Sequence, residues 1–236
     1  MIGSKIIIKR GARDEAEKPF WISFADLMTA LMVLFLVVMG VALLAVTKNV
    51  TERGKAEEQH RKDIELIIER FTEAAKRYDG IKVDKDRRVI DFGDRARFAF
   101  GKSNLAADQE SVLRQFVPEI LTIANDDLGE RVFKRVVIEG YTDKTGSYLS
   151  NLNLSLQRSQ RVLCTMFATS GANQLSDRQK ESVRNLFLVG GYSFNAAKDT
   201  DEESRRVEMR MEFLGMDERR LSAMAQSGNF GDCAIR

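Results

Sequence analysis

A single carboxylate lies inside an otherwise apolar stretch near the start of this 236-residue chain. Asp26 is the only charged residue between Lys18 and Lys48, and about 20 apolar residues are enough to cross a bilayer as a helix. Helical spacing places Ser23 and Thr29 on the same face as Asp26, which gives that face a narrow polar seam. Hydrocarbon favours the neutral form of a carboxyl group, so Asp26 is suited to binding and releasing a proton.

Two other interpretations of Asp26 stay open on the sequence alone. The carboxyl group could be a packing group that is hydrogen-bonded to a serine or threonine of a partner. Alternatively, the span could begin after it, because residues 27–46 are long enough to cross a bilayer by themselves. A cleaved signal peptide fits poorly, since its apolar core covers only about 7–15 residues and this segment is longer.

A second pair of charged residues lies in the C-terminal half of the chain. Asp143 follows the apolar stretch RVVIEGY, which is typical of a strand, and Arg158 lies on the helix expected next. Such a pair can bind a ligand that carries both an ammonium and a carboxylate, with the planar guanidinium holding the carboxylate. The alternative is a structural salt bridge between the strand end and the helix.

The charge and hydropathy pattern divides the chain into five segments. These are a polar leader (1–18), a transmembrane helix (19–47), a linker helix (48–80), a domain of mixed structure (81–216) and a tail (217–236). Basic residues in a short flank favour the cytoplasmic side of a bacterial inner membrane. We therefore expect a single-pass protein with its leader inside and its domain in the periplasm.

Alternating strand and helix patterns predict an α/β, or α+β, fold for the domain. We expect strands within RVIDFG (88–93), RVVIEGY (135–141), LFLVGGYS (186–193) and RRVEMRMEFL (205–214). We expect helices over 108–126 and 149–169, and a further one that begins after Ser176 as its N-cap. Residues 205–214 alternate apolar and charged side chains, which predicts a strand with one buried face.

The linker segment has the pattern of an amphipathic helix that ends at Asp79-Gly80. Its apolar residues recur at helical spacing, as Ile64, Ile67, Ile68, Phe71, Ala74, Ala75 and Tyr78. This stripe could pack on the domain that follows, pair with a second copy of itself, or do both.

The chain has two cysteines, and both follow the span. An oxidising compartment permits a disulfide between Cys164 and Cys233, which would pin the tail onto the helix that carries Cys164. The alternative is two separate thiols, because sequence alone does not place the two Cα atoms.

Composition argues against several classes of function. A formal net charge of +2 argues against direct nucleic-acid binding through bulk charge. The single histidine, His60, lies in a charged segment where we expect it to be solvated, and no Ser/His or Cys/His arrangement suggests an enzyme. The acidic clusters at 125–130 and 199–204 lack calcium-loop spacing and are expected to be solvated loops, so we expect no metal site and no cofactor.

The span resembles that of MotB-type stator subunits, in which a single aspartate carries the ion. The match falls on Trp21, Ala25, Asp26, Met28 and Thr29. The resemblance implies that H+, or alternatively Na+, is the transported ion. ExbD and TolR subunits share the lone aspartate but lack a domain like the one that follows here.

The stretch after the second expected strand resembles the peptidoglycan-binding motif of OmpA-like domains. The matching residues are Gly140, Thr142, Asp143, Gly146, Asn151, Leu154, Ser155 and Arg158, with Phe100 and Leu105 or their neighbours before them and Arg205, Arg206 and Val207 after them. The resemblance implies that Asp143 and Arg158 bind the diaminopimelate of the stem peptide, supported by Asn151, Leu154 and Arg205. Ser159 departs mildly from the small alanine that is usual after the arginine.

The combination of this span, a compact linker and an OmpA-like domain most resembles the ZorB family of Zorya anti-phage defence. That resemblance implies a homodimer inside a pentamer of a MotA-like (ZorA-like) membrane subunit, anchored to peptidoglycan and acting indirectly on cytosolic effectors. A flagellar MotB-type stator subunit and a passive tether between membrane and cell wall are the alternatives. A passive tether would use Asp26 only for packing.

Overall fold

The structure is a computed structural model that describes residues 14–220 and 230–233 of the chain. Most of the predicted leader and part of the predicted tail lie outside the described residues. The chain divides into two compact units, Met1–Ala56 and Glu57–Arg236. The predicted domain boundary at residue 81 therefore falls inside the second unit.

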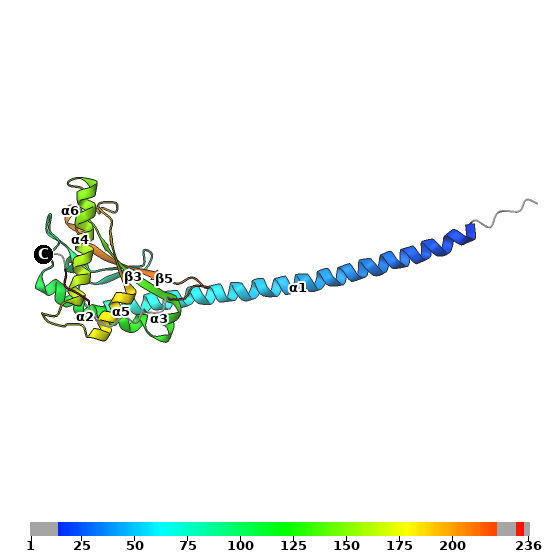
Figure 1. Cartoon of the computed structure of the whole chain (residues 1–236), viewed down its shortest axis with the longest axis horizontal. Coiled ribbons are helices and arrows are strands. Elements are labelled where there is room, and N and C mark those ends of the chain that lie inside the picture. The colour runs from blue at the N-terminus through cyan, green and yellow to red at the C-terminus, as the bar shows by residue number, and fades with distance from the viewer. Residues whose placement is uncertain (1–13, 221–229, 234–236) are drawn as a thin grey trace, which may run out of the picture. The chain divides into compact units, whose positions relative to one another are not determined.

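A single helix, α1 (Asp14–Ala75), covers both the predicted span and most of the predicted linker (Figure 1). No break separates the two, and Thr47 and Thr51 donate hydrogen bonds to carbonyl groups one turn earlier, at Leu43 and Thr47. Within the part of the chain that the structure describes, it is the one helix long and apolar enough to cross a membrane. It ends at Ala75, before the predicted end at Asp79-Gly80.

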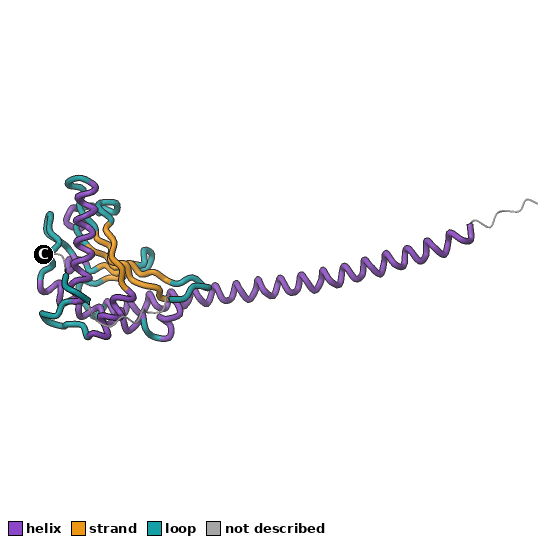
Figure 2. Tube along the Cα trace, in the orientation of Figure 1, coloured by secondary structure: helices purple, strands orange, loops and turns teal. Residues whose placement is uncertain are grey.

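The second unit is built on a five-stranded sheet with the order β1-β2-β5-β3-β4 (Figure 2). The strands are β1 (Lys82–Asp84), β2 (Val89–Asp91), β3 (Phe133–Gly140), β4 (Phe187–Gly191) and β5 (Val207–Phe213). Strands β3 and β4 are parallel, and the other neighbours are antiparallel. The four predicted strands are confirmed, whereas the short β1 was not predicted.

Among the described residues, five helices and one short 3-10 turn accompany the sheet. They are η1 (Gly93–Ala96), α2 (Ala107–Ala124), α3 (Asp127–Val132), α4 (Tyr148–Phe167), α5 (Asp177–Leu186) and α6 (Asp201–Ser204). The predictions of α2, α4 and α5 are confirmed, and Ser176 caps α5 by accepting from the Gln179 amide.

The prediction that both acidic clusters are loops is wrong. Each cluster contains the start of a short helix, because the side-chain oxygen of its N-cap residue accepts a hydrogen bond from an amide of the first turn. Asp126 accepts from Gly129 at the start of α3, and Thr200 accepts from Glu203 at the start of α6. Acidic side chains also suit the positive end of a helix dipole.

The apolar stripe of α1 belongs to the core of the second unit. Ile67 and Phe71 are fully buried, and the Phe71 ring lies 5.4 Å from that of Phe133. The predicted packing of the linker on the domain is therefore observed. His60 is not freely solvated as predicted, because its Nε2 lies 2.9 Å from the Leu214 carbonyl oxygen at the end of the last strand.

Gly140 allows α4 to lie against the end of β3. A Cβ built at this position would lie 1.9 Å from the Ser155 carbonyl oxygen, in the backbone of α4. Ser155 in turn accepts a hydrogen bond from the Ser193 amide just after β4. The glycine of the motif is thus required by the close approach of helix and sheet.

We expect Gly140→Ala to lower the free energy of unfolding by about 1–3 kcal/mol, as overpacking does elsewhere. The measurement is thermal unfolding of the full chain in detergent. Gly54→Ala is the matched control, since its Cβ would meet nothing within 4 Å on α1, and alanine stabilises a helix interior relative to glycine. Equal unfolding temperatures for the two variants would contradict the argument.

Candidate functional site

Asp26 lies on the apolar part of α1, beside a shallow groove. The groove is lined by Ile22, Ser23, Ala25, Asp26 and Thr29, which places the predicted polar seam on one face. The Thr29 hydroxyl donates to the carbonyl groups of Ala25 and Asp26, at 3.0 and 2.9 Å. Its oxygen keeps acceptor capacity, so the seam offers a carboxylate and a hydroxyl oxygen side by side.

Asp143 lies just after the end of β3, and both of its carboxylate oxygens have partners. Oδ1 accepts from the Thr145 amide at 3.0 Å, and Oδ2 accepts from Arg205 Nη1 at 3.2 Å. Burial alone would raise the pKa of Asp143, but these hydrogen bonds outweigh it and hold the pKa below its ordinary value. The carboxylate is therefore ionised at neutral pH.

The N-terminal part of α4 holds the loop that carries Asp143. Ser147 caps the helix by accepting from the Ser150 amide, and the Asn151 side chain donates to the Thr145 carbonyl at 2.9 Å. Leu154 is half-buried one turn later. Asn151 thus has a clear positioning role for the loop.

Arg158 is fully buried and donates to three backbone carbonyl groups. Nε donates to Lys102 at 2.9 Å, Nη1 to Tyr141 at 2.7 Å and Nη2 to Ala99 at 3.3 Å. Its guanidinium also lies over the Phe98 ring, 5.1 Å from the centroid. Burial lowers the pKa of Arg158 to about 10, and the charge of Asp143 opposes this shift.

The direct ion pair of Asp143 is with Arg205, and not with Arg158 as the salt-bridge alternative proposed. Arg205 also donates to Glu202 at 2.8 Å and, through Nε, to the Phe98 carbonyl at 3.2 Å. Glu202 was missed by the sequence analysis. Its spacing of three residues from Arg205 was the available signal, because residues three apart on a helical turn are neighbours.

The aromatic residue of the site is Phe98, and not Phe100. Phe98 is 4 % exposed beneath Arg158, whereas Phe100 is 64 % exposed. The sequence motif allowed either position, since both lie a few residues before Leu105.

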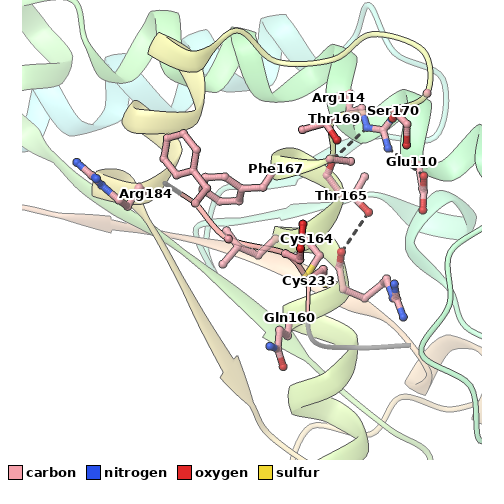
Figure 3. A pocket seen from close by; sticks show the side chains of 17 residues that line it. Glu110, Arg114, Gln160, Cys164, Thr165, Phe167, Thr169, Ser170, Arg184 and Cys233 are labelled. Atoms are coloured by element: carbon pink, nitrogen blue, oxygen red, sulfur yellow. Dashed lines mark hydrogen bonds and ion pairs between the residues drawn. A yellow bond between two sulfur atoms is a disulfide. The ribbon is translucent and has the colours of Figure 1, made fainter. Parts of the chain in front are cut away.

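A disulfide joins Cys164 of α4 to Cys233 of the tail (Figure 3). The Phe167 ring, one turn further along α4, lies 5.0 Å from the Phe230 ring, so two contacts hold this part of the tail on the helix. A pocket beside the bridge is also lined by Glu110 and Arg114. Arg114 donates to Glu110 and to the carbonyl groups of Thr165, Ser170 and Ala172, so its guanidinium is satisfied within the domain.

Residues 8–48 match the family described as "Membrane MotB of proton-channel complex MotA/MotB". The chain is 44 % identical over 223 residues to the Zorya protein ZorB of an Escherichia coli O139:H28 strain, covering 93 % of this chain and 91 % of that protein.

Two solved structures are also similar to the chain, at low identity. The periplasmic domain of MotB is 14 % identical with a TM-score of 0.40, and covers 58 % of this chain and 69 % of its own. The OmpA-like domain of FopA1 from Francisella tularensis is 19 % identical with a TM-score of 0.36, and covers 54 % of this chain and 75 % of its own.

Proposed function

This chain belongs to the ZorB family, and we propose that it is the wall-anchored B subunit of an ion-driven motor in the bacterial inner membrane that acts in anti-phage defence. The observation that carries the proposal is Asp26, an isolated carboxylate on the apolar part of α1 within a segment that matches the MotB family. The protein is a MotB-type, stator-like subunit and not an enzyme in this proposal.

The proposed role of Asp26 is to carry the ion, with H+ as the first candidate and Na+ as the alternative. Binding of a proton neutralises the carboxylate, and release restores its charge, so the seam changes its affinity for the surrounding helices in each cycle. One elementary charge that crosses 100 mV releases about 2.3 kcal/mol, which is enough to bias a conformational cycle. The partners are a second copy of this chain and a pentameric MotA-like ring, and cytosolic effectors respond indirectly.

The proposed role of the second unit is to bind the stem peptide of peptidoglycan. A carboxylate and two guanidinium groups lie close together, at Asp143 just after β3, Arg158 of α4 and Arg205 before β5. This set of charges suits a ligand that carries an ammonium and a carboxylate, such as diaminopimelate. The disulfide between Cys164 and Cys233 supports a periplasmic location, because disulfides persist in oxidising compartments.

The defence role is tested by phage plating on cells that carry the native operon, with this reading frame intact or deleted. We expect deletion to abolish protection without affecting swimming. Loss of swimming with unchanged plating would instead favour a flagellar stator. No effect on either would refute a motor role in both settings.

Retention on peptidoglycan tests the anchor. We expect Asp143→Asn to weaken co-sedimentation of the detergent-solubilised chain with purified sacculi about 10- to 100-fold, because a charge-assisted hydrogen bond is worth about 1.5–3 kcal/mol. Asparagine can still accept from the Thr145 amide, so the loop is preserved. Asp127→Asn, an exposed aspartate of α3, is the control and should bind normally.

The pH dependence of retention follows from the same carboxylate. The pKa of Asp143 is below its ordinary value of 3.8, so binding should be constant from neutral pH down to about pH 4 and fall only below that. A loss of binding between pH 7 and 5 would contradict the role of Asp143.

A further inference from the structure

The backbone turn at residues 99–102 covers Arg158. Two of the three carbonyl groups that hold the guanidinium come from this turn, at Ala99 and Lys102. The Lys102 amide donates to the Ala99 carbonyl at 3.0 Å, which closes the turn, and Gly101 adopts a φ of +65°. The turn therefore places two carbonyl dipoles on the buried cation.

Arg158 has no carboxylate among the hydrogen-bond partners described. It is 0 % exposed, and its three acceptors are neutral carbonyl groups. The nearby Asp143 carboxylate is engaged by Arg205 instead. A buried cation is costly unless an anion compensates it, so a ligand carboxylate would be a better partner for Arg158 than the carbonyl groups that it has.

A ligand cannot reach a guanidinium that is fully buried unless one of the covering groups moves. The Tyr141 carbonyl is fixed, because Tyr141 follows β3 directly and its amide donates to the Arg206 carbonyl at 2.9 Å. The turn is the looser cover. Phe100 at its tip is 64 % exposed, and a Cβ at Gly101 would meet nothing within 4 Å.

We propose that residues 99–102 form a lid on the binding site, which Arg158 holds shut until a ligand carboxylate replaces the carbonyl groups of Ala99 and Lys102. This proposal rests on the proposed wall-binding function and adds a mechanism that regulates access to the binding site. Binding then includes the cost of opening the lid, so the apparent affinity is lower than that of an open site. A ligand without the carboxylate cannot open the lid.

Gly101→Ala tests the lid, because it should increase affinity. Alanine is strained at this φ but meets no steric obstacle, so the variant destabilises the closed turn and leaves the open site unchanged. We expect the stem peptide L-Ala-γ-D-Glu-diaminopimelate to bind the full-length variant in detergent about fivefold more tightly than wild type, or better still. Gly231→Ala is the matched control, with a φ of +67° and open space, and should bind as wild type does.

Hydrogen exchange of the Lys102 amide provides the direct readout. In wild type we expect the stem peptide to accelerate this exchange, and the same peptide with its diaminopimelate carboxylate amidated to leave it unchanged. Unchanged exchange together with equal affinities for wild type and Gly101→Ala would overturn the lid alone and leave wall binding intact. Failure of both proteins to bind the peptide would overturn wall binding and the lid together.

Discussion

Cells that carry the native operon are expected to lose phage protection when Asp26 is replaced by asparagine, while the protein still reaches the membrane. Asparagine is nearly isosteric with aspartate and can make the packing hydrogen bonds of a polar seam, but it cannot bind and release a proton. The substitution therefore separates an ion-carrying role from a packing role. We expect plating efficiency to equal that of cells without the operon.

Asp26→Glu is the informative companion variant. Glutamate keeps an ionisable carboxyl group but moves it by one methylene along the seam, so partial protection is expected if proton exchange is the essential property. Membrane fractionation of each variant supplies the control for insertion. Full protection by Asp26→Asn would refute the motor role and favour a passive tether between membrane and wall.

Local patterns in the sequence were sufficient for most of the fold. Strand β5 and helices α2, α4 and α5 follow from periodicity and capping, because those features depend on residues close together in the chain. The prediction for the two acidic clusters failed although the signal there is also local, because the caps were not recognised. Asp126 and Thr200 look like loop residues until their side chains are seen to cap the short helices that follow.

The contacts of the site depend on distant residues, and the sequence could not assign them. The motif identified Asp143, Arg158 and Arg205 as neighbours in space but not which arginine pairs with the aspartate. That choice depends on the turn at residues 99–102. Its carbonyl groups accept hydrogen bonds from Arg158, and Asp143 forms its ion pair with Arg205 instead. Every residue has a backbone carbonyl group, so the sequence does not show which of them a distant arginine contacts.

Strand β5 also departs from the simple pattern of one buried and one solvated face. Glu208 is 0 % exposed, although it lies on the face expected to be charged and solvated. It is the register partner of Glu139, which is also buried. Two like charges directly opposite are unfavourable, so each carboxylate needs its own cation, and Arg210 fills that role for Glu139 at 2.7 Å.

Glu208→Ala should be the most destabilising of the substitutions in the second unit. Glu208 accepts from Arg206 Nε at 2.8 Å and from Arg87 at 2.6 Å, and Arg206 is itself buried over the Tyr141 ring. Removal of one member of a buried ion pair costs about 3–5 kcal/mol, because the other charge is left without a partner. Thermal unfolding of the full chain in detergent, followed by near-ultraviolet circular dichroism, measures the loss.

Glu212→Ala is the matched control on the same face of the same strand. Glu212 pairs with Arg135 at 2.6 Å, but both side chains are partly exposed, so we expect a loss of no more than about 1 kcal/mol. A loss at Glu208 as small as that at Glu212 would contradict the buried network. Because Arg206 adjoins Arg205, the Glu208 variant should also weaken retention on peptidoglycan at temperatures where it remains folded.

The pH dependence of unfolding distinguishes this charge network from simple loss of packing. Burial alone would raise the pKa of Glu208, but hydrogen bonds from Arg87 and Arg206 outweigh it, so the folded-state pKa lies below the ordinary 4.5. A lowered pKa means that the stabilisation is present above about pH 4.5 and is lost as the pH falls through the folded-state value. Wild type should therefore lose stability below about pH 4.5 more steeply than Glu208→Ala, and parallel pH profiles would show that the ionised carboxylate contributes nothing.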